Sequence, residues 1–424
     1  MIIRQKYLDE LIRFQGQDLV KVVTGVRRSG KSTLLDMMRE YLRDQGVPEA
    51  SLLTFKMESM EYDTVTDYHD LYALVCERTK DVKHPYLFFD ELQEISGWER
   101  AINSLRVDKD CDIYITGSNA YLLSSELSTF LSGRYVEIEM LPLTFAEYLQ
   151  FRGMKWFPRE SDQADLALGA NGSVATLSNM FMQYRQFGGL PVLALSDPSR
   201  ENHRTYCKSL YDTVVIRDIL ERDKRRDRRR LTNPDLLEKI CAFLADNIGN
   251  ENSITSITNA LEQQGTKAAN DTVDAYVGAL CEAYLFYPVK RYDIKGKELL
   301  KTNGKHYMVD TGLRNYLQGY RDSDQGRVLE NIVYLQLRHD GYEVSVGKKL
   351  SSEIDFVASR NDERFYIQVT ESMRDTAQQE RELKPLRKTG DSYPKMIVVS
   401  EGSYPTSIDG IRIVSTIDYL LHRY

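Results

Sequence analysis

The sequence predicts an α/β protein of several domains, in which a parallel sheet covered by helices comes first. Short apolar runs alternate with amphipathic helical patterns through about the first 150 residues, the order expected of such a sheet. A glycine-rich loop at residues 25–32 joins the first apolar run to a helical pattern. A second α/β pattern closes the chain, whose 424 residues are enough for two or three packed cores.

The composition excludes several classes of protein. Hydrophobic residues make up 42% and charged residues 28%, as in an ordinary globular protein. The formal net charge of −7 provides no chain-wide surface for a polyanion, so any contact with nucleic acid must come from a local patch. The five cysteines include no C-x-x-C pair, which argues against a disulfide framework or a zinc ribbon and for a reducing compartment.

Membrane and export signals are not apparent in the sequence. Apolar runs stay well short of the ~18 residues that a membrane span needs, and the first residues lack the apolar core of a signal peptide. We therefore expect a cytoplasmic protein that makes no membrane contact.

The first domain, which contains the glycine-rich loop, is expected to span residues 1–152. Each predicted strand is an apolar run, and each predicted helix has apolar residues at helical spacing. Gly46-Val47-Pro48 ends the second helix, because glycine and proline both break helices. In chain order the pattern predicts helix 4–15, strand 19–23, helix 33–45, strand 52–55, helix 67–78, strand 85–90, helix 98–107, strand 112–116 and strand 135–139.

Three further regions are predicted after this domain. Residues 153–232 should form a helical linker or lid, with a mobile loop near 160–175 and a long helix over 200–229. Residues 310–424 alternate helix and strand and predict a small α/β domain. Residues 233–309 have the layout of a winged-helix module, with helices at 236–247, 256–263 and 271–285 and a hairpin of strands 286–289 and 307–309.

The loop at residues 25–32, GVRRSGKS, matches the pattern G-x-x-x-x-G-K-[ST] between a strand and a helix. Glycines let the backbone curl so that N–H groups point inward, and the helix start adds the positive end of its dipole. Lys31 should reach the β- and γ-phosphates of a nucleotide, and the Ser32 hydroxyl should hold Mg²⁺. The predicted nucleotide-binding residues are Gly25, Arg27, Arg28, Ser29, Gly30, Lys31, Ser32 and Thr33.

Two carboxylates, Asp90 and Glu91, follow the apolar strand 85–90 in the order of a Walker B site. Beside a phosphate loop, Asp90 can hold Mg²⁺ and its water shell, while Glu91 can orient and polarise the attacking water. An Asp-Glu pair after a strand is also a common solvated turn. The prediction of a catalytic pair therefore depends on the phosphate loop upstream.

Other polar residues of this domain have two interpretations each. Asn119, or its neighbour Ser118, could contact the γ-phosphate or the water as a sensor, or could cap a helix. Arg134 could be an arginine finger that reaches the nucleotide of a neighbouring subunit, or a surface charge. Arg27 and Arg28 could pair with phosphate or with acidic neighbours. The sequence leaves these alternatives open.

Two features raise the question of nucleic-acid binding. The run 217–230 contains eight basic residues against four acidic ones, and this interleaving favours a solvated helix with internal ion pairs over a DNA-binding helix. The winged-helix pattern adds to the case for DNA. However, its third helix, at 271–285, begins with acidic residues where a helix that reads DNA should be basic.

The last domain contains three residues in the arrangement of a degenerate nuclease site: Glu330 on a helix, Asp355 on a strand and Gln368 on the next strand. In the restriction-nuclease fold, such carboxylates hold Mg²⁺ and a lysine two residues after the Glu or Gln activates water. Here Thr370 stands where that lysine is expected, and a threonine cannot supply the positive charge. The sequence therefore predicts a restriction-endonuclease-like fold without nuclease activity.

Nine stretches together carry a resemblance to a known family: VKVVTGVRRSGKSTLL (20–35), YLFFDELQEISGWE (86–99), IYITGSNAYLL (113–123), LSGRYVEIEMLPLTFAEY (131–148), FGGLPVL (187–193), LADNIGN (244–250), YMVDTGLRN (307–315), SSEIDFV (351–357) and YIQVTESM (366–373). They resemble AAA-type ATPases of bacteria and archaea whose C-terminal half carries a domain of unknown function with a restriction-nuclease-like core. The resemblance spans nearly the whole chain. It implies ATP and Mg²⁺ binding at Gly30, Lys31, Ser32 and Asp90, with Glu91 as catalytic carboxylate, and no settled biological role.

The leading hypothesis is a Mg²⁺-dependent ATPase that uses its nucleotide state to reorder its C-terminal half. ATP and Mg²⁺ are the expected cofactors, DNA or a protein is the expected partner of the C-terminal half, and Arg134 would fit a homo-oligomer. One alternative is an ATP-gated DNA-binding protein or nuclease. Another is a nucleotide-gated protein-interaction scaffold, although the Asp90-Glu91 pair argues against a scaffold that does not hydrolyse nucleotide.

Overall fold

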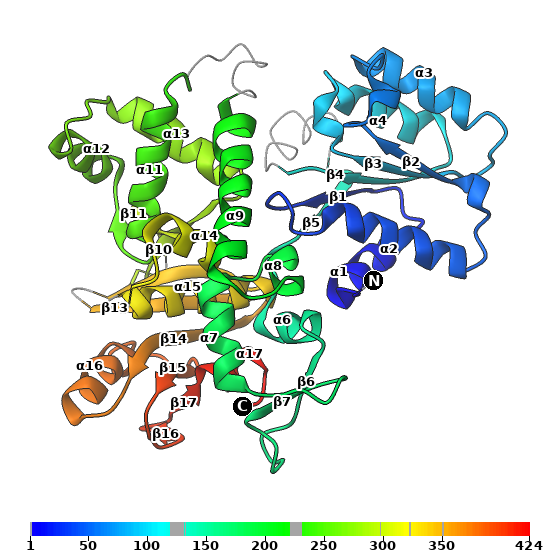
Figure 1. Ribbon diagram of the computed structural model, residues 1–424. Coiled ribbons are helices and arrows are strands. Elements are labelled where there is room, and N and C mark those ends of the chain that lie inside the picture. Colours follow the sequence, from blue (N-terminus) through cyan, green and yellow to red (C-terminus); the bar gives the residue numbers. More distant parts are fainter. Residues whose placement is uncertain are drawn as a thin grey trace. The chain divides into compact units, whose positions relative to one another are not determined.

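The computed structural model describes residues 2–424 except 119–130, 132, 221–230, 297, 322–323 and 350–351. The chain divides into two compact units. The first unit comprises residues 1–141 together with 282–284, and the second comprises residues 142–281 together with 285–424. Figure 1 shows the first unit mainly in blue and cyan and the second in green to red.

A parallel sheet of five strands forms the centre of the first unit, in the order β2-β3-β4-β1-β5. Every neighbouring pair of these strands is parallel, which confirms the predicted α/β fold with a parallel sheet. Since β3, β4 and β1 are neighbours, the residues after these strands meet at one edge of the sheet. The strands are β1 (Val20–Thr24), β2 (Leu52–Lys56), β3 (Tyr86–Asp90), β4 (Asp112–Thr116) and β5 (Tyr135–Glu139).

Helices cover both faces of this sheet (Figure 1). Neighbouring residues of β1 point to opposite faces, as the period of a strand requires. Val22 packs in the core beneath α3 and α4, whereas Val23 packs in the core beneath α1 and α2. The strand is therefore buried on both sides, and this explains its continuous apolar sequence. The helices are α1 (Gln5–Arg13), α2 (Lys31–Asp44), α3 (Tyr68–Arg78) and α4 (Trp98–Asp108).

Residues 282–284 belong to the first unit, although the chain before and after them belongs to the second. The Thr24 hydroxyl donates to Glu137 Oε1 at 2.8 Å, and the Tyr284 hydroxyl donates to the same oxygen at 3.3 Å. Thr24 is the last residue of β1 and directly precedes the glycine loop. Two hydrogen bonds thus connect the end of β1 to this short segment.

The larger sheet of the second unit has nine strands in the order β16-β17-β15-β14-β13-β12-β10-β11-β9. The predicted hairpin is present as the antiparallel pair β10–β11, and β10 also pairs in parallel with β12. One sheet therefore contains strands from both the predicted winged-helix module, residues 233–309, and the predicted last domain, residues 310–424. The strands are β9 (Glu251–Asn252), β10 (Phe286–Asp293), β11 (Glu298–Met308), β12 (Glu343–Lys349), β13 (Ser352–Arg360), β14 (Glu363–Ser372), β15 (Lys395–Glu401), β16 (Ser407–Ile408) and β17 (Ile411–Ser415).

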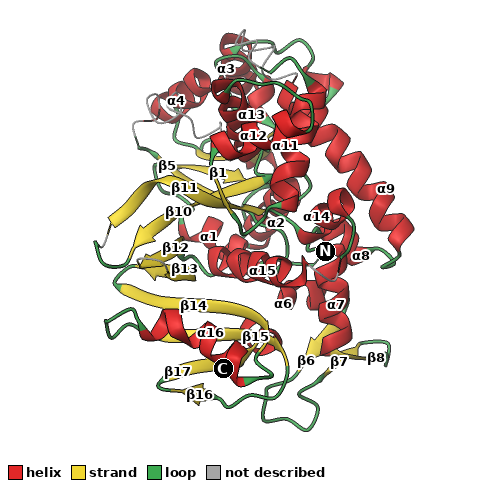
Figure 2. Cartoon of the chain, turned by 90° about the vertical axis from the view of Figure 1, so that its left-hand side faces the viewer, coloured by secondary structure: helices red, strands yellow, loops and turns green. Residues whose placement is uncertain are grey.

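Helices α15 (Gln325–His339) and α16 (Thr376–Arg387) lie on opposite sides of this sheet (Figure 2). Phe356 of β13 packs toward Tyr334 of α15, with 6.3 Å between the ring centroids, whereas the next residue, Val357, joins the core that contains Leu383 of α16. Both faces of the central strands are thus buried, as expected of an α/β domain.

The remaining helices precede the sheet in the chain or connect its strands. Helices α11 (Pro234–Asp246), α12 (Ile254–Gln263) and α13 (Asn270–Glu282) come before the β10–β11 hairpin in the predicted order, and their assignment to a winged helix stays a prediction. In the described part of the chain, no helix has both the length and the apolar character needed to cross a membrane. The other helices are α6 (Phe145–Phe151), α7 (Leu177–Phe187), α8 (Pro191–Leu195), α9 (Arg200–Tyr211), α14 (Thr311–Gln318) and α17 (Thr416–Leu420).

Residues 153–232 differ from the sequence prediction in two places. Where a loop is predicted near 160–175, the structure has β7 (Leu166–Gly169) and β8 (Val174–Thr176), which form an antiparallel sheet with β6 (Met154–Trp156). Gly172, with a φ of 81°, lies in the β7–β8 turn, so Asn171-Gly172 was a hairpin signal that the polar composition obscured. Where a helix over 200–229 is predicted, α9 ends at Tyr211 and 212–218 continue as a π-helix. Residues 221–230 lie outside the described part.

A buried carboxylate, Asp310, holds two distant stretches of the second unit together. Its Oδ1 accepts from the N–H of Leu313 at 2.9 Å, and its Oδ2 accepts from the N–H of Gly189 at 2.7 Å. A Cβ atom on Gly188 would lie 2.2 Å from Asp310 Oδ1, and one on Gly312 would lie 2.0 Å from the Phe187 carbonyl oxygen. Burial raises the pKa of Asp310 to about 6, although the N–H groups around it oppose this shift.

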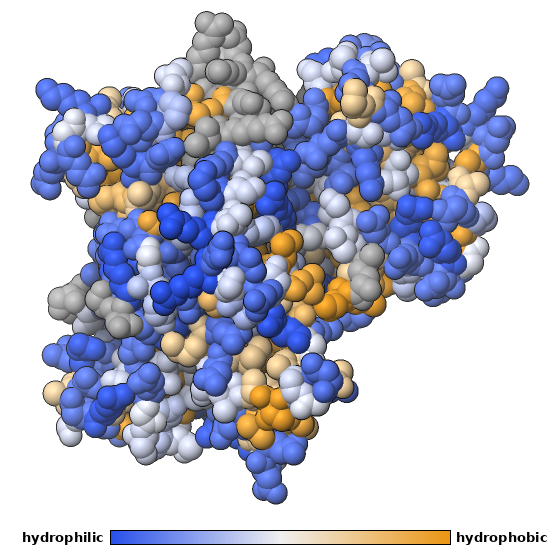
Figure 3. Space-filling view, in the orientation of Figure 1, coloured by the Kyte–Doolittle hydropathy of each residue, from blue (hydrophilic) through white to orange (hydrophobic). Residues whose placement is uncertain are grey.

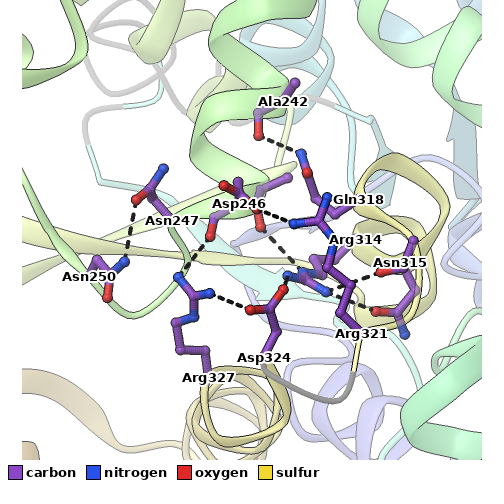
Figure 4. Close-up of polar contacts among 12 residues, drawn as sticks. Ala242, Asp246, Asn247, Asn250, Arg314, Asn315, Gln318, Arg321, Asp324 and Arg327 are labelled. Atoms are coloured by element: carbon purple, nitrogen blue, oxygen red, sulfur yellow. Dashed lines mark hydrogen bonds and ion pairs between the residues drawn. The ribbon is translucent and has the colours of Figure 1, made fainter. Parts of the chain in front are cut away.

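A network of buried polar contacts joins α14 to α11 and α15 (Figure 4). Arg314 is almost fully buried and donates to Asp324 at 2.6 Å, while Arg327 donates to the other oxygen of Asp324 at 2.5 Å. The side-chain amide of Gln318 donates to the Ala242 carbonyl at 2.7 Å. These contacts fix the position of α14 against α11.

Candidate functional site

The glycine loop at residues 25–32 connects β1 to α2 at the carboxyl edge of the first sheet. Gly25 and Gly30 have φ values of 128° and 104°, which favour glycine. A Cβ atom on Gly25 would lie 2.3 Å from the Met140 carbonyl oxygen, so only glycine fits at this position of the loop. Gly30 is also the N-cap of α2 and has no side chain that could accept from the first N–H groups. Those N–H groups and the helix dipole suit a phosphate.

Lys31 lies within the curl of this loop and is buried. Its Nζ donates to the carbonyl oxygens of Gly25 at 2.9 Å and Val26 at 3.0 Å. Ser32 and Thr33 follow it and are exposed at the start of α2. The loop thus holds an ammonium group close to the N–H groups of the helix, the arrangement that a nucleotide phosphate requires.

Three oxygen-bearing side chains meet beside the loop. Asp90, at the end of β3, accepts through Oδ1 from the Ser32 hydroxyl at 2.9 Å and from the Thr116 hydroxyl at 2.5 Å. Ser32 and Asp90, the two predicted Mg²⁺ ligands, are therefore adjacent. Hydroxyl and carboxylate oxygens are the ligands that Mg²⁺ prefers, and Mg²⁺ needs few from the protein because it keeps waters and substrate phosphates. The residues present thus fit this ion.

Thr116 was not among the predicted site residues. It ends the apolar strand β4 and would have been found from the rule that strand-end residues of neighbouring parallel strands meet at one edge. Besides its bond to Asp90, its hydroxyl accepts from the backbone N–H of Glu91 at 3.2 Å. Thr116 therefore connects the two predicted carboxylates.

Glu91 is held in an unusual backbone conformation with a φ of 53°, which is rare for residues other than glycine. Its Oε2 accepts from the Ser118 hydroxyl at 3.3 Å and from the side-chain amide of Gln93. Such strain persists where the surroundings impose it, and it is often found at functional sites. The carboxylate is thus oriented by two side chains that donate to the same oxygen.

The arginines of the loop are placed at its outer side. Arg27 pairs with Glu58, with 2.8 Å between Nη2 and Oε1, so the structure contains the acidic partner that the sequence offered as one alternative. Burial raises the pKa of Glu58, Arg27 opposes this, and Glu91 and Asp90 raise it further. Arg28 is exposed and has a φ of 66°.

Ser29 is buried, and its carbonyl oxygen accepts from Arg4 Nη1 at 3.4 Å. The same Arg4 nitrogen donates to the Leu141 carbonyl at 2.7 Å. Ser29 thus contributes to the loop at least through its backbone, which Arg4 supports from α1's N-cap position.

One predicted catalytic residue, Arg134, lies away from the glycine loop. Arg134 is exposed, and its carbonyl oxygen accepts from the N–H of Val20 at the beginning of β1, the edge of the sheet opposite the glycine loop. Arg134 is therefore too far away to serve the loop of its own chain, and a role at another copy stays a prediction. Asn119 lies outside the described residues, as does most of the basic run 217–230.

In the second unit, the structure brings together the three residues of the predicted degenerate nuclease site. Asp355 accepts from the N–H of Val369 at 2.8 Å, and its own N–H donates to Gln368 Oε1 at 3.4 Å. Burial raises the pKa of Asp355 well above its ordinary value, and the nearby carboxylate of Glu330 raises it further. The hydroxyl of Thr370 donates to the Ser372 carbonyl at 3.2 Å.

A lysine that the sequence did not indicate lies in the same cluster. Lys305 of β11 is buried, and its Nζ lies 2.9 Å from Glu330 Oε1 and 2.8 Å from Glu353 Oε1. Burial lowers the pKa of Lys305, but the carboxylates of Glu330, Asp355 and Glu353 outweigh burial and raise it. The ammonium group thus compensates the carboxylates that a divalent metal would need as ligands.

Comparison with known proteins places the chain among its relatives. Residues 17–149 match the AAA domain family, and residues 178–324 match a domain of unknown function, DUF8612. An uncharacterized protein of Haemophilus influenzae is 38% identical over 423 residues, which cover 99% of both chains. The chain belongs to the same family. The uncharacterized protein MJ1544 of Methanocaldococcus jannaschii is 29% identical over 378 residues, which cover 87% of this chain and 78% of that protein.

The AAA match contains all five strands of the first sheet, the glycine loop and the Asp90-Glu91 pair, so this chain carries a P-loop domain of the AAA type. Among solved structures, the Walker-type ATPase PABY2304 of Pyrococcus abyssi covers 75% of this chain and 96% of its own, with 16% identity and a TM-score of 0.48. AMPPCP-bound DnaA from Aquifex aeolicus covers 66% of this chain and 90% of its own, with 15% identity and a TM-score of 0.30.

Proposed function

We propose that this protein is a Mg²⁺-dependent ATPase that uses its nucleotide state to change the conformation of its C-terminal part. The observation that carries the proposal is the meeting of Ser32, Asp90 and Thr116 beside the Lys31 ammonium, within an AAA domain. This arrangement supplies a phosphate-binding loop and a set of oxygen ligands at the same edge of one sheet.

In this proposal the chain's own residues divide the work of binding. The N–H groups of the loop and of the first turn of α2 would bind the phosphates, and Lys31 would exchange its bonds to the Gly25 and Val26 carbonyls for bonds to the β- and γ-phosphates. Ser32 and Asp90 would hold Mg²⁺, which when bound neutralises charge on the phosphates. Thr116 would orient Asp90 through its hydrogen bond.

Glu91 would act on the attacking water. Its carboxylate can accept a proton or a hydrogen bond from that water, which positions the water oxygen for attack on the γ-phosphorus. Ser118 and Gln93 hold the carboxylate, and the bond from the Glu91 N–H to Thr116 holds its backbone. Glu91, which would activate the water, is thus connected to Thr116, which would orient the metal ligand Asp90.

The link from Thr24 through Glu137 to Tyr284 supports a conformational output. Thr24 immediately precedes the loop, so a change in the loop on nucleotide binding would act directly on this residue. Tyr284 lies in the segment 282–284, which is separated from the start of β10 at Phe286 by a single residue. A contact that forms when nucleotide binds and is released after hydrolysis can move the part of the chain that is connected to it.

The other hypotheses gain little from the described residues. The carboxylates of the nuclease-like cluster are already paired with Lys305, so this cluster does not favour a nuclease. Binding of DNA or of a protein partner, and assembly into a homo-oligomer, stay predictions from the sequence.

The proposal is tested by two variants of the full chain. Lys31→Ala should abolish binding of a fluorescent ATP analogue, because the ammonium for the β- and γ-phosphates is lost. Glu91→Gln should bind the analogue as tightly as the parent but hydrolyse ATP about 10²- to 10⁴-fold more slowly, the usual contribution of a general base. Phosphate release in the presence of Mg²⁺, with and without duplex DNA, measures the turnover.

Matched controls are available on exposed positions of the same unit. Lys80→Ala and Glu77→Gln change the same residue types at exposed sites and should leave both binding and turnover unchanged. Tight ATP binding by Lys31→Ala would remove the loop from the mechanism, and an unchanged rate in Glu91→Gln would remove Glu91 from it.

A further inference from the structure

A cavity of about 690 Å³ lies in the second unit. Its walls come from the end of α7 and from α9, α11 and α14. All of its lining residues fall between Gln186 and Tyr320, and thus inside the stretch that matches the domain of unknown function. The cavity is within the size range of small-molecule sites in proteins and lies apart from the glycine loop in the sequence.

The cavity has a fixed shape because its walls are bonded to one another. Gln318 of α14 donates to the Ala242 carbonyl of α11, and Figure 4 shows this contact next to the Arg314 and Asp324 ion pair. The side-chain amide of Asn315 also donates to the carbonyl oxygens of Arg185 and Gln186 at the end of α7, at 3.1 and 3.0 Å. A ligand would therefore meet walls that are already in place, which reduces the entropy lost on binding.

One side of the cavity carries positive charge. Arg200 and Arg204 are four residues apart on α9, so their side chains lie on the same face of the helix, and both are exposed. Neither forms an ion pair with a carboxylate of the described residues, whereas Lys239 of α11, which also lines the cavity, is paired with Asp235 at 2.6 Å. Two like charges side by side on one helix face oppose each other, and an anion between them would relieve this repulsion.

Aromatic side chains also line the cavity. Tyr211 of α9 and Tyr316 of α14 lie with their ring centroids 6.3 Å apart, and Phe187 and Tyr320 also line the space. The surface over α9 is mainly hydrophilic in Figure 3. A planar ring can pack on tyrosine side chains, and guanidinium groups bind phosphate oxygens in a bidentate manner.

We propose that this cavity binds a nucleotide, with its base against Tyr316 and Tyr211 and its phosphate between Arg200 and Arg204. The nucleotide is either free or the terminal nucleotide of a single strand, since both present one base and one phosphate. The exposed carboxylate of Glu238, which also lines the cavity, can accept from an amino group of the base.

The full chain carrying Lys31→Ala provides the test, because this change removes the phosphate contact of the other nucleotide site. Fluorescence of mant-labelled AMP and anisotropy of a 5′-phosphorylated, dye-labelled four-thymidine oligonucleotide measure the two sources separately. Adding Arg200→Gln and Arg204→Gln together should weaken binding by about ten-fold or more, because two charged hydrogen-bond donors are lost. Tyr316→Leu should weaken it by about five-fold or more through lost stacking.

Arg374→Gln serves as the control, since it removes an exposed arginine of the same unit that does not line the cavity. It should leave both affinities unchanged. Binding of AMP alone supports a free nucleotide, binding of the oligonucleotide alone supports a strand end, and binding of both supports the shared chemistry. Binding of neither at millimolar concentration overturns the proposal, as does binding that the arginine and tyrosine variants leave unchanged. The arginine positions are exposed, so a folding defect does not account for a loss there.

Discussion

The replacement Lys305→Met keeps an unbranched side chain only one atom shorter and removes the positive charge from the carboxylate cluster of the second unit. The ammonium lies 2.9 Å from Glu330 and 2.8 Å from Glu353, and the lysine side chain is only 3% exposed. Removing one member of a buried ion pair leaves uncompensated charge and costs about 3–5 kcal/mol. Because Glu353 is 32% exposed, water screens part of its charge, and we expect a loss near the lower end, about 3 kcal/mol, at pH 8.

The loss should depend on pH. Without the ammonium, burial and mutual repulsion should raise the pKa of the carboxyl groups in the folded state above the unfolded value of about 4.3. Asp355 shows the direction already, since burial and Glu330 raise its pKa. A carboxyl group with a raised folded pKa binds protons more tightly in the folded state, so the stability of the variant rises as pH falls. The deficit relative to the parent should therefore be smaller at pH 5 than at pH 8.

Differential scanning calorimetry of the full chain measures this deficit, since it can separate the transitions of two units. A loss of about 3 kcal/mol corresponds to a midpoint lowered by roughly 6–12 °C. Lys208→Met is the matched control: it removes an exposed lysine 2.9 Å from Asp212 and should lower the midpoint by no more than about 2 °C. A loss below about 1 kcal/mol at pH 8, or equal losses at both pH values, would refute the argument that Lys305 compensates this cluster.

Two further predictions concern single backbone and carboxylate positions. Gly25→Ala places a Cβ atom 2.3 Å from the Met140 carbonyl oxygen, so it should abolish binding of a fluorescent ATP analogue, whereas Gly16→Ala, which meets no atom within 4 Å, should bind as the parent does. Asp310→Asn removes a group whose pKa is raised to about 6, so the parent should lose stability as pH rises from about 4 to 6, by up to about 3 kcal/mol, and the variant should lack this slope. Unfolding midpoints at pH 4, 5, 6 and 7 compare the two slopes, and parallel curves would show that Asp310 does not titrate in this range.

The first unit could be predicted almost entirely from the sequence, because its information is local. Each strand of the parallel sheet is a continuous apolar run, and the loop pattern fixes which strand leads to which helix. The pairing of Asp90 with Ser32 agrees with the predicted Mg²⁺ ligands, which are inferred from a carboxylate pair after a strand and a phosphate loop upstream. Thr116 escaped notice because a threonine that ends an apolar strand looks like part of the strand.

The second unit was harder because its pairings join distant parts of the chain. Strands β10 and β12 pair in parallel, although a hairpin strand and two helices separate them in the sequence. No local sequence pattern predicts this pairing. Lys305 was missed for the same reason. It lies 25 residues before Glu330 and on a different element, so no spacing motif connects it to the carboxylates it pairs with. Long-range sheet order has to be known before such a cluster can be seen.

The stretches that carry the resemblance to AAA-type ATPases reflect two different physical constraints. In the loop at 25–32 the constrained residues present N–H groups and an ammonium group, as a ligand requires. At 187–193 and 307–315 the constraint is close packing, because Gly188 and Gly312 have no room for a side chain around the Asp310 carboxylate. The resemblance to AAA-type ATPases in those two stretches therefore reflects the packing of the fold and does not indicate a second catalytic centre. Function in the second unit is better sought where polar and aromatic side chains face open space, as Arg204 and Tyr316 do.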